Sequence, residues 1–81
     1  MQQAEIYSRL NEIARDVFDD DSIELSPATT ARDIPAWDSV NHINLIIAIE
    51  TRFGIKFRTS EFESLQNVGS LAGIIESKLP K

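Results

Sequence analysis

A chain of 81 residues without cysteine has room for one small core, and it excludes disulfides, thiolate metal sites and cysteine nucleophiles. Hydrophobic residues make up 42% and charged residues 26%, the composition of a globular rather than a disordered protein. The net charge of -5 argues against nucleic acid as a partner, because binding to phosphates needs a basic surface. There is no signal pattern and no apolar run of about 18 residues. We therefore expect one cytoplasmic domain over residues 1–81, without membrane insertion.

The negative charge is concentrated in the first half of the chain. Residues 16–38 hold seven acids and one arginine, a net charge of -6, whereas residues 1–15 are balanced and residues 39–81 have a net charge of +1. Such a segment suits partners with basic surfaces, mainly by steering their encounter. It does not match a calcium-binding EF-hand loop, because residues 19–24 lack the glycine that such a loop needs.

The first predicted element is an amphipathic helix over residues 4–18. Apolar residues recur there at spacings of three and four, which indicates one buried stripe. The stripe consists of Ile6, Leu10, Ile13, Ala14, Val17 and Phe18.

A long loop is predicted over residues 19–38, which contain two prolines and no apolar period. Loops of this length are uncommon without packing of their own. We therefore expect Ile23, Leu25 and Ile34 to fold back onto the helices, and a short helical turn at residues 27–31.

A second helix is predicted from Ser39 to Phe53, with Gly54 suited to the left-handed position that ends a helix. Asp38 and Ser39 stand at its start, where a short side-chain oxygen can accept from the free N–H groups of the first turn. Those N–H groups and the helix dipole would also accommodate a phosphate on the serine hydroxyl. Plain capping is the commoner use of such a serine, and this stretch alone leaves both uses open.

The apolar residues of this second helix fall into two arcs when each residue turns the helix by about 100°. The arc predicted to face the core contains Leu45, Ile46, Ile49 and Phe53. The other arc contains Val40, Ile43 and Ile47. This second arc either packs on another helix or stays exposed for a partner, since exposed apolar patches mark binding surfaces.

An extended connection and a short helix are predicted to follow. Residues 55–57 alternate like a strand but are too few to build a sheet. Ser60 and Glu63 have the spacing of a capping box, which predicts a short helix that turns Phe62 and Leu65 inward.

The last predicted element is a helix that Asn67 caps and Pro80 ends. Its recurring apolar residues are Val68, Leu71, Ile74, Ile75 and Leu79. The predicted fold is all-α: a small four-helix bundle of three principal helices and one short helix, with a long loop between helices one and two.

The residues give little support for an enzyme. His42, the only histidine, lies one turn after Ser39 and could approach it. No known motif supplies a third group to orient it, and so small a chain has little material for a substrate pocket. His42 falls in the arc of Leu45 and Ile49, so we expect a partly buried polar group. One histidine with scattered acids also makes no zinc site.

Trp37, just before the second helix, has two interpretations. It is either a hydrophobic staple that packs back on the helix or an exposed contact for a partner or a cargo arm. We favour the staple.

Two runs of residues resemble acyl carrier proteins. The run at the start of the second helix, similar to the family's Asp-Ser-Leu motif, is Asp38-Ser39-Val40. The run at its far end is Ile49-Glu50-x-x-Phe53-Gly54-Ile55. The order of helix, long loop, helix, short helix and final helix also matches the family. The resemblance therefore covers essentially the whole chain, and the two runs together are more specific than the three-residue motif.

The resemblance implies that Ser39 carries a 4′-phosphopantetheine arm, transferred from coenzyme A by a phosphopantetheinyl transferase that uses magnesium. The thiol at the tip of the arm would hold acyl groups as thioesters, so the chain would be a carrier and not an enzyme. Asp38 corresponds to the motif neighbour that lies by the transferase and its metal. The face that partner enzymes touch corresponds to Val40, Ile43, Ile47 and Glu50, with Trp37 as a further candidate.

The chain departs from bacterial fatty-acid carriers, which usually bear several acids along the second helix. The matching positions here are Asn41, Asn44, Thr51 and Arg52, and only Glu50 is acidic. This departure indicates a carrier for a dedicated lipid, polyketide or related pathway. We also expect a monomer, served by acyl-activating or acyl-transferring enzymes. The alternatives are a carrier of aminoacyl, D-alanyl or peptidyl groups and, in another class, a helical interaction module without a prosthetic group.

Overall fold

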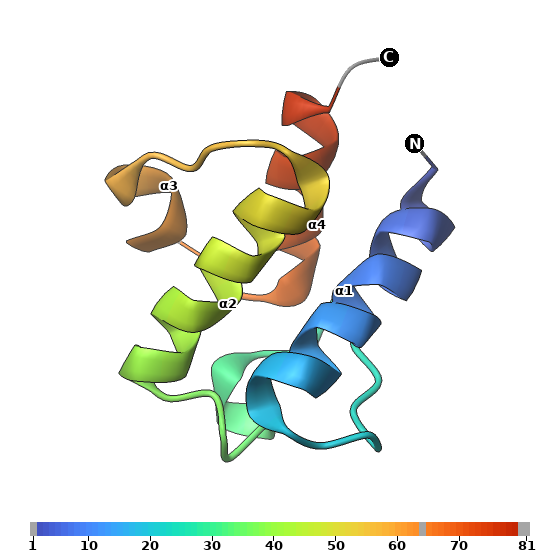
Figure 1. Cartoon of the computed structure of the whole chain (residues 1–81), viewed down its shortest axis with the longest axis vertical. Helices are drawn as coiled ribbons and strands as arrows, with labels where there is room; N and C mark the ends of the chain where they lie inside the picture. Colours follow the sequence, from blue (N-terminus) through green and yellow to red (C-terminus); the bar gives the residue numbers. More distant parts are fainter. Residues whose placement is uncertain (1, 64, 80–81) are drawn as a thin grey trace.

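The computed structural model describes residues 2–63 and 65–79, except for the side chain of Phe62. This part of the chain forms α1 (Gln3–Phe18), η1 (Ala31–Asp33), α2 (Ser39–Phe53), α3 (Thr59–Glu63) and α4 (Val68–Lys78). The helices α1, α2 and α4 are longer than α3 (Figure 1). The predicted all-α fold is confirmed. None of the described helices is long and apolar enough to cross a membrane.

The core lies where α1 packs on both α2 and α4. Its largest fully buried side chains are Ile6, Leu10, Ile13, Leu45, Ile49, Val68, Leu71 and Ile75. The predicted stripes of the three principal helices therefore meet inside the bundle. Val17 and Phe53 are only half-buried. Phe53 stands in the last turn of α2, where the Arg9 guanidinium lies over its ring at 6.0 Å.

Left-handed residues end the first two principal helices. Gly54 has a φ of 69° and follows α2, as predicted, and its N–H donates to the carbonyl of Glu50 at 2.9 Å. Asp19 has a φ of 52° and follows α1. Besides glycine, aspartate is one of the few residues that adopt the left-handed conformation.

The long loop between α1 and α2 is fastened to α1 by packing and by hydrogen bonds. Ile23 and Leu25 are buried and Ile34 is half-buried, which confirms the predicted anchors. The Arg15 Nε donates to the carbonyl of Ile23 at 2.8 Å. The backbone N–H of Leu25 donates to the side-chain oxygen of Asn11 at 2.7 Å. Polar groups of α1 thus satisfy the backbone of an otherwise irregular segment.

The short helix of the loop lies later than predicted. It was expected at residues 27–31, but η1 covers Ala31–Asp33, and a turn closed by the backbone N–H of Thr29 comes before it. The Asp33 carboxylate accepts from the backbone N–H of Thr30 at 2.9 Å, which marks the start of η1. The proline therefore begins a turn, and the aspartate three residues after the threonine begins the helix.

The start of α4 touches this loop. The backbone N–H groups of Val68 and Gly69 donate to the carbonyl oxygens of Thr29, at 2.8 Å, and Pro27, at 3.0 Å. Asn67 caps the helix, as predicted, by accepting from the backbone N–H of Ser70 at 2.8 Å. The loop and α4 are thus held backbone to backbone.

We expect Gly69→Ala to lower the free energy of unfolding by about 1 kcal/mol, because added atoms in a close contact force neighbours apart. A Cβ at Gly69 would lie 3.0 Å from the Pro27 carbonyl oxygen and 3.2 Å from the Asn67 side-chain oxygen. Gly73→Ala is the matched control, since its Cβ would meet no atom within 4 Å. Alanine there should stabilise α4 by up to about 1 kcal/mol. Urea unfolding measures the free energy of unfolding of both variants. An equal increase in both would contradict the close contact at Gly69.

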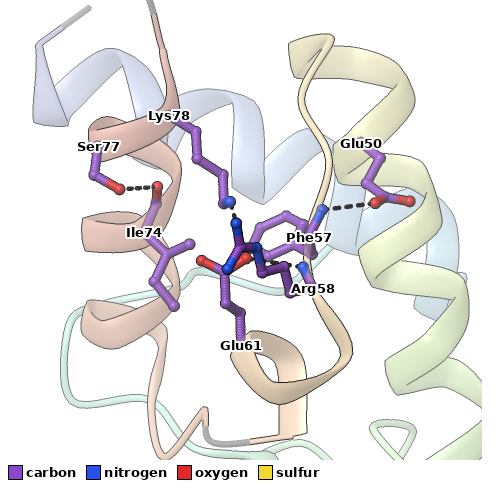
Figure 2. Close-up of polar contacts among 7 residues, drawn as sticks. All are labelled: Glu50, Phe57, Arg58, Glu61, Ile74, Ser77 and Lys78. Atoms are coloured by element: carbon purple, nitrogen blue, oxygen red, sulfur yellow. Dashed lines mark hydrogen bonds and ion pairs between the residues drawn. The ribbon is translucent and has the colours of Figure 1, made fainter.

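The helix α3 begins one residue before the predicted serine. The backbone N–H of Arg58 donates to the Glu61 carboxylate at 2.8 Å, so the predicted capping contact between Ser60 and Glu63 is wrong. The capping contact lies two residues earlier than predicted. Arg58 is the residue before α3, and Glu61 stands three residues after it. The Lys78 ammonium of α4 lies 2.9 Å from the same Glu61 oxygen (Figure 2). This Glu61 oxygen therefore connects the start of α3 to the end of α4.

Two further predictions fall at the edges of the described residues. Leu65 is half-buried against the core, as predicted, whereas the side chain of Phe62 and the residue Pro80 lie outside the described part of the chain. Leu79, predicted to be helical, is the residue after α4 and has an extended backbone. It still packs against the core.

The Glu61 contacts predict an acid dependence of stability. The backbone hydrogen bond from Arg58 and then Lys78 hold the pKa of Glu61 below its ordinary value. A carboxyl with a lowered pKa in the folded state stabilises the fold above its unfolded pKa, and this stabilisation is lost as the pH falls through the lowered value. Glu61→Gln should therefore lose less stability than the wild type between about pH 6 and about pH 3.

Urea midpoints at both pH values measure this difference. Glu63→Gln, on the exposed side of the same helix, is the control and should follow the wild type. Parallel curves for the wild type and Glu61→Gln would show that the contacts around Glu61 do not stabilise the fold.

Candidate functional site

The start of α2 exposes Ser39. The Asp38 carboxylate occupies the cap position and accepts from the backbone N–H of Asn41 at 2.8 Å. Ser39 is thus the first residue of the helix, its side chain is exposed, and within residues 2–63 and 65–79 no hydrogen bond engages its hydroxyl. The interpretation of Ser39 as a plain cap is therefore wrong, because the aspartate one residue earlier already reaches the free N–H group.

Asn41 also fixes the chain that enters α2. Its side-chain N–H donates to the carbonyl of Ala36 at 2.7 Å, and the backbone N–H of Trp37 donates to the carbonyl of Ile34 at 2.9 Å. The residues just before Ser39 are therefore held on both sides. These hydrogen bonds define the turn that places the Ser39 hydroxyl at the start of α2.

Trp37 packs inside the bundle and contacts His42. Its side chain is 9% exposed, and its ring centroid lies 5.8 Å from that of Phe18. Its Nε1 donates to the His42 Nδ1 at 3.0 Å, and the two rings stack at 6.1 Å. This burial favours the staple over an exposed partner contact. His42 is half-buried, as predicted, and its Nδ1 is engaged by Trp37 and so does not serve Ser39 as a base.

An open groove of about 680 Å³ runs beside Ser39. Its lining residues come from η1, from the start of α2 and the two residues before it, and from the end of α3 and the segment after it: Ala31, Trp37, Asp38, Ser39, His42, Ile43, Glu63 and Leu65. Behind Trp37 and His42, a cavity of about 50 Å³ reaches Leu71 in α4. The hydroxyl therefore stands at the edge of a groove with apolar walls and two carboxylates at its rim. This arrangement suits a chain attached to Ser39 better than a reaction performed by the site itself.

The second apolar arc of α2 is exposed. The exposed fractions are 68% for Val40, 52% for Ile43 and 54% for Ile47. We call these three residues the α2 strip. It begins next to Ser39 and runs along the helix on the side away from the buried Leu45 and Ile49. Of the two uses that the sequence allows for this arc, the structure shows the exposed one.

Glu50, which the resemblance to the family places on the partner face, has an internal contact. Its side chain is half-buried, and its Oε2 accepts from the backbone N–H of Phe57 at 2.8 Å (Figure 2). It thereby holds the connection between α2 and α3. Sequence reasoning missed this contact because the donor is a backbone group seven residues away, in a segment without a period.

The structure thus presents a small helical bundle with one exposed serine hydroxyl at the start of its second principal helix, beside an apolar groove. A solved structure with the same fold is the solution NMR structure of a holo acyl carrier protein from Geobacter metallireducens. The two chains are 48% identical with a TM-score of 0.85, over 90% of this chain and 84% of that chain.

Curated relatives agree with this likeness. An acyl carrier protein of Thermosynechococcus vestitus is 32% identical over 80 residues, 98% of each chain, and one of Thermotoga maritima is 27% identical over 93% of each chain. No family model matches the chain. The chain belongs to the acyl carrier protein family, and like other members of that family it is a carrier and not an enzyme.

Proposed function

We propose that Ser39 carries a 4′-phosphopantetheine arm on which this chain holds acyl groups as thioesters. The observation that carries the proposal is the exposed Ser39 hydroxyl at the first position of α2, which no hydrogen bond from the described residues engages. The relative from Geobacter metallireducens is a holo acyl carrier protein, which supports a prosthetic group here.

The residues around Ser39 fit such an arm. The first-turn N–H groups and the dipole of α2 favour a phosphate attached to the hydroxyl. Asp38 is held by the N–H of Asn41, so it leaves the hydroxyl accessible. We assign Asp38 to the metal of the transferase, since its exposed carboxylate adjoins the attachment site. Ile43 and Leu65 in the groove offer an apolar wall to the arm and its cargo.

In the attachment step, the Ser39 Oγ forms a bond to the phosphorus that carries the pantetheine. The pyrophosphate linkage of coenzyme A breaks, its nucleotide half leaves, and the hydroxyl proton passes to a base of the transferase. The arm then supplies a thiol for thioester formation. The part of this chain is to hold Ser39 outside the core and to present α2 to the enzymes that load and unload the cargo.

The proposed partners are a phosphopantetheinyl transferase and acyl-activating or acyl-transferring enzymes. The α2 strip is the proposed contact, because its three side chains are exposed and it begins next to Ser39. The lack of exposed acids on α2 supports a dedicated lipid, polyketide or related pathway. A cytoplasmic, monomeric protein with one domain over residues 1–81 stays our prediction.

Incubation with coenzyme A, Mg²⁺ and a broad-specificity phosphopantetheinyl transferase should add the mass of one arm to each chain. Intact-mass spectrometry measures the product. A second carrier protein in the same reaction controls for the transferase. If that carrier were modified and this chain were not, the proposed function would be wrong.

A further inference from the structure

We propose that partner enzymes bind the α2 strip in an apolar socket, and that their basic residues lie only opposite the acidic loop at the start of α2. This inference rests on the proposed function, because it assumes that partners approach Ser39. Beyond the partner face that the resemblance implies, it specifies where on this chain apolar contact and where charge would act.

No acidic residue of α2 belongs to its exposed side chains. All 15 residues of α2 are described, and its one acid is Glu50, whose carboxylate holds the backbone N–H of Phe57. Exposed polar side chains on this face bond within the helix: the Thr51 hydroxyl donates to the Ile47 carbonyl at 3.1 Å, and Asn44 donates to the Asn41 side chain at 3.3 Å. A partner therefore meets mainly the methyl groups of the strip.

The far end of α2 carries a positive charge. Arg52, in the last turn, lies 3.1 Å from the Asp16 carboxylate of α1, and both side chains are at least half exposed. An exposed pair of this kind contributes little attraction for a third charge. A basic side chain of a partner would therefore gain no electrostatic attraction at this end of α2.

The acidic charge gathers at the opposite end. Figure 1 shows the loop between α1 and α2 at the same end of the bundle as the start of α2. The exposed acids of this loop, which we call the acidic loop, are Asp19, Asp20, Asp21, Glu24, Asp33 and Asp38. Complementary charge places the basic residues of a partner over this loop, where they steer the encounter.

The strip is continuous with the attachment site. Val40 follows Ser39 directly, and Ile43 belongs to the strip and also lines the groove beside Ser39. An enzyme whose active site takes in the arm attached to Ser39 must therefore cover this end of the α2 strip. Burial of these side chains in an apolar socket would supply binding free energy that salt does not screen.

The test compares kcat/KM for modification of Ser39 by the broad-specificity transferase, with coenzyme A and Mg²⁺, over a range of NaCl concentrations. Ile47→Asn should lower kcat/KM about tenfold at every salt concentration, and Val40→Asn should act in the same direction. Asp20→Asn together with Asp21→Asn should flatten the salt dependence. Glu50→Gln should change neither, because glutamine removes the charge and keeps an acceptor for Phe57.

Urea unfolding of each variant separates binding effects from loss of the fold. An unchanged kcat/KM in folded Ile47→Asn and Val40→Asn, or a flattened salt dependence in Glu50→Gln, would overturn the inference. So would a wild-type dimer in sedimentation velocity that Ile47→Asn dissociates, since a second copy would then cover the strip. Absence of any modification in the wild type would instead overturn the proposed function.

Discussion

Ile49→Ala should lower the free energy of unfolding by about 2–5 kcal/mol, because it removes buried methyl groups and leaves a cavity. Ile47→Ala, two residues earlier in α2, should change it by less than about 0.5 kcal/mol. The two positions share a residue type and a helix, and they differ in burial: Ile49 is 0% exposed and Ile47 is 54% exposed. Urea unfolding of both variants under the same conditions measures the difference.

The comparison separates core from surface on α2. If Ile47→Ala cost as much as Ile49→Ala, the α2 strip would be part of the core and could not serve as a partner surface. Phe53→Ala should fall between the two, because Phe53 is half-buried beneath the Arg9 guanidinium.

Ser39→Ala should abolish attachment of the arm, because it removes the oxygen that forms the bond to phosphorus. Ser70→Ala is the matched control, as Ser70 is an exposed serine in the first turn of α4. Intact-mass spectrometry after incubation with the transferase should show the added mass in the wild type and in Ser70→Ala and not in Ser39→Ala. An added arm in Ser39→Ala would place the attachment elsewhere.

The same variant also tests how α2 begins. Ser39→Ala should leave the free energy of unfolding close to that of the wild type, because the Asp38 carboxylate caps the helix. Asp38→Ala should cost about 0.5–2 kcal/mol, the usual loss for a cap residue. A large loss in Ser39→Ala alone would show that the serine has a structural use.

The parts of the fold that the sequence predicts are those set by local spacing. Three- and four-residue periods mark the principal helices, and Gly54 marks the end of α2 because glycine adopts the left-handed backbone of that position without strain. The anchors Ile23 and Leu25 follow from the cost of leaving a long loop unpacked. The two arcs of α2 also follow from its helical period, although only the structure shows which arc is exposed.

Other features depend on which of several nearby polar side chains accepts from a given backbone N–H group. Asp38 and Ser39 are adjacent acceptors at one helix start, and the sequence does not decide between them. The contact of Glu50 with Phe57 and that of Lys78 with Glu61 join groups that come together only when the bundle closes. The resemblance places Glu50 on the partner face, and the sequence does not show that its carboxylate also accepts from the backbone N–H of Phe57.

The central claim is that Ser39 is a covalent attachment point. The most direct measurement is mass spectrometry of the protein purified from its own cells, with analysis of the peptide that contains Ser39. The account predicts that this peptide carries a phosphopantetheine arm, with a thioester-bound group whose mass distinguishes an acyl cargo from an aminoacyl or peptidyl one. A peptide in which Ser39 is unmodified in every molecule would contradict it.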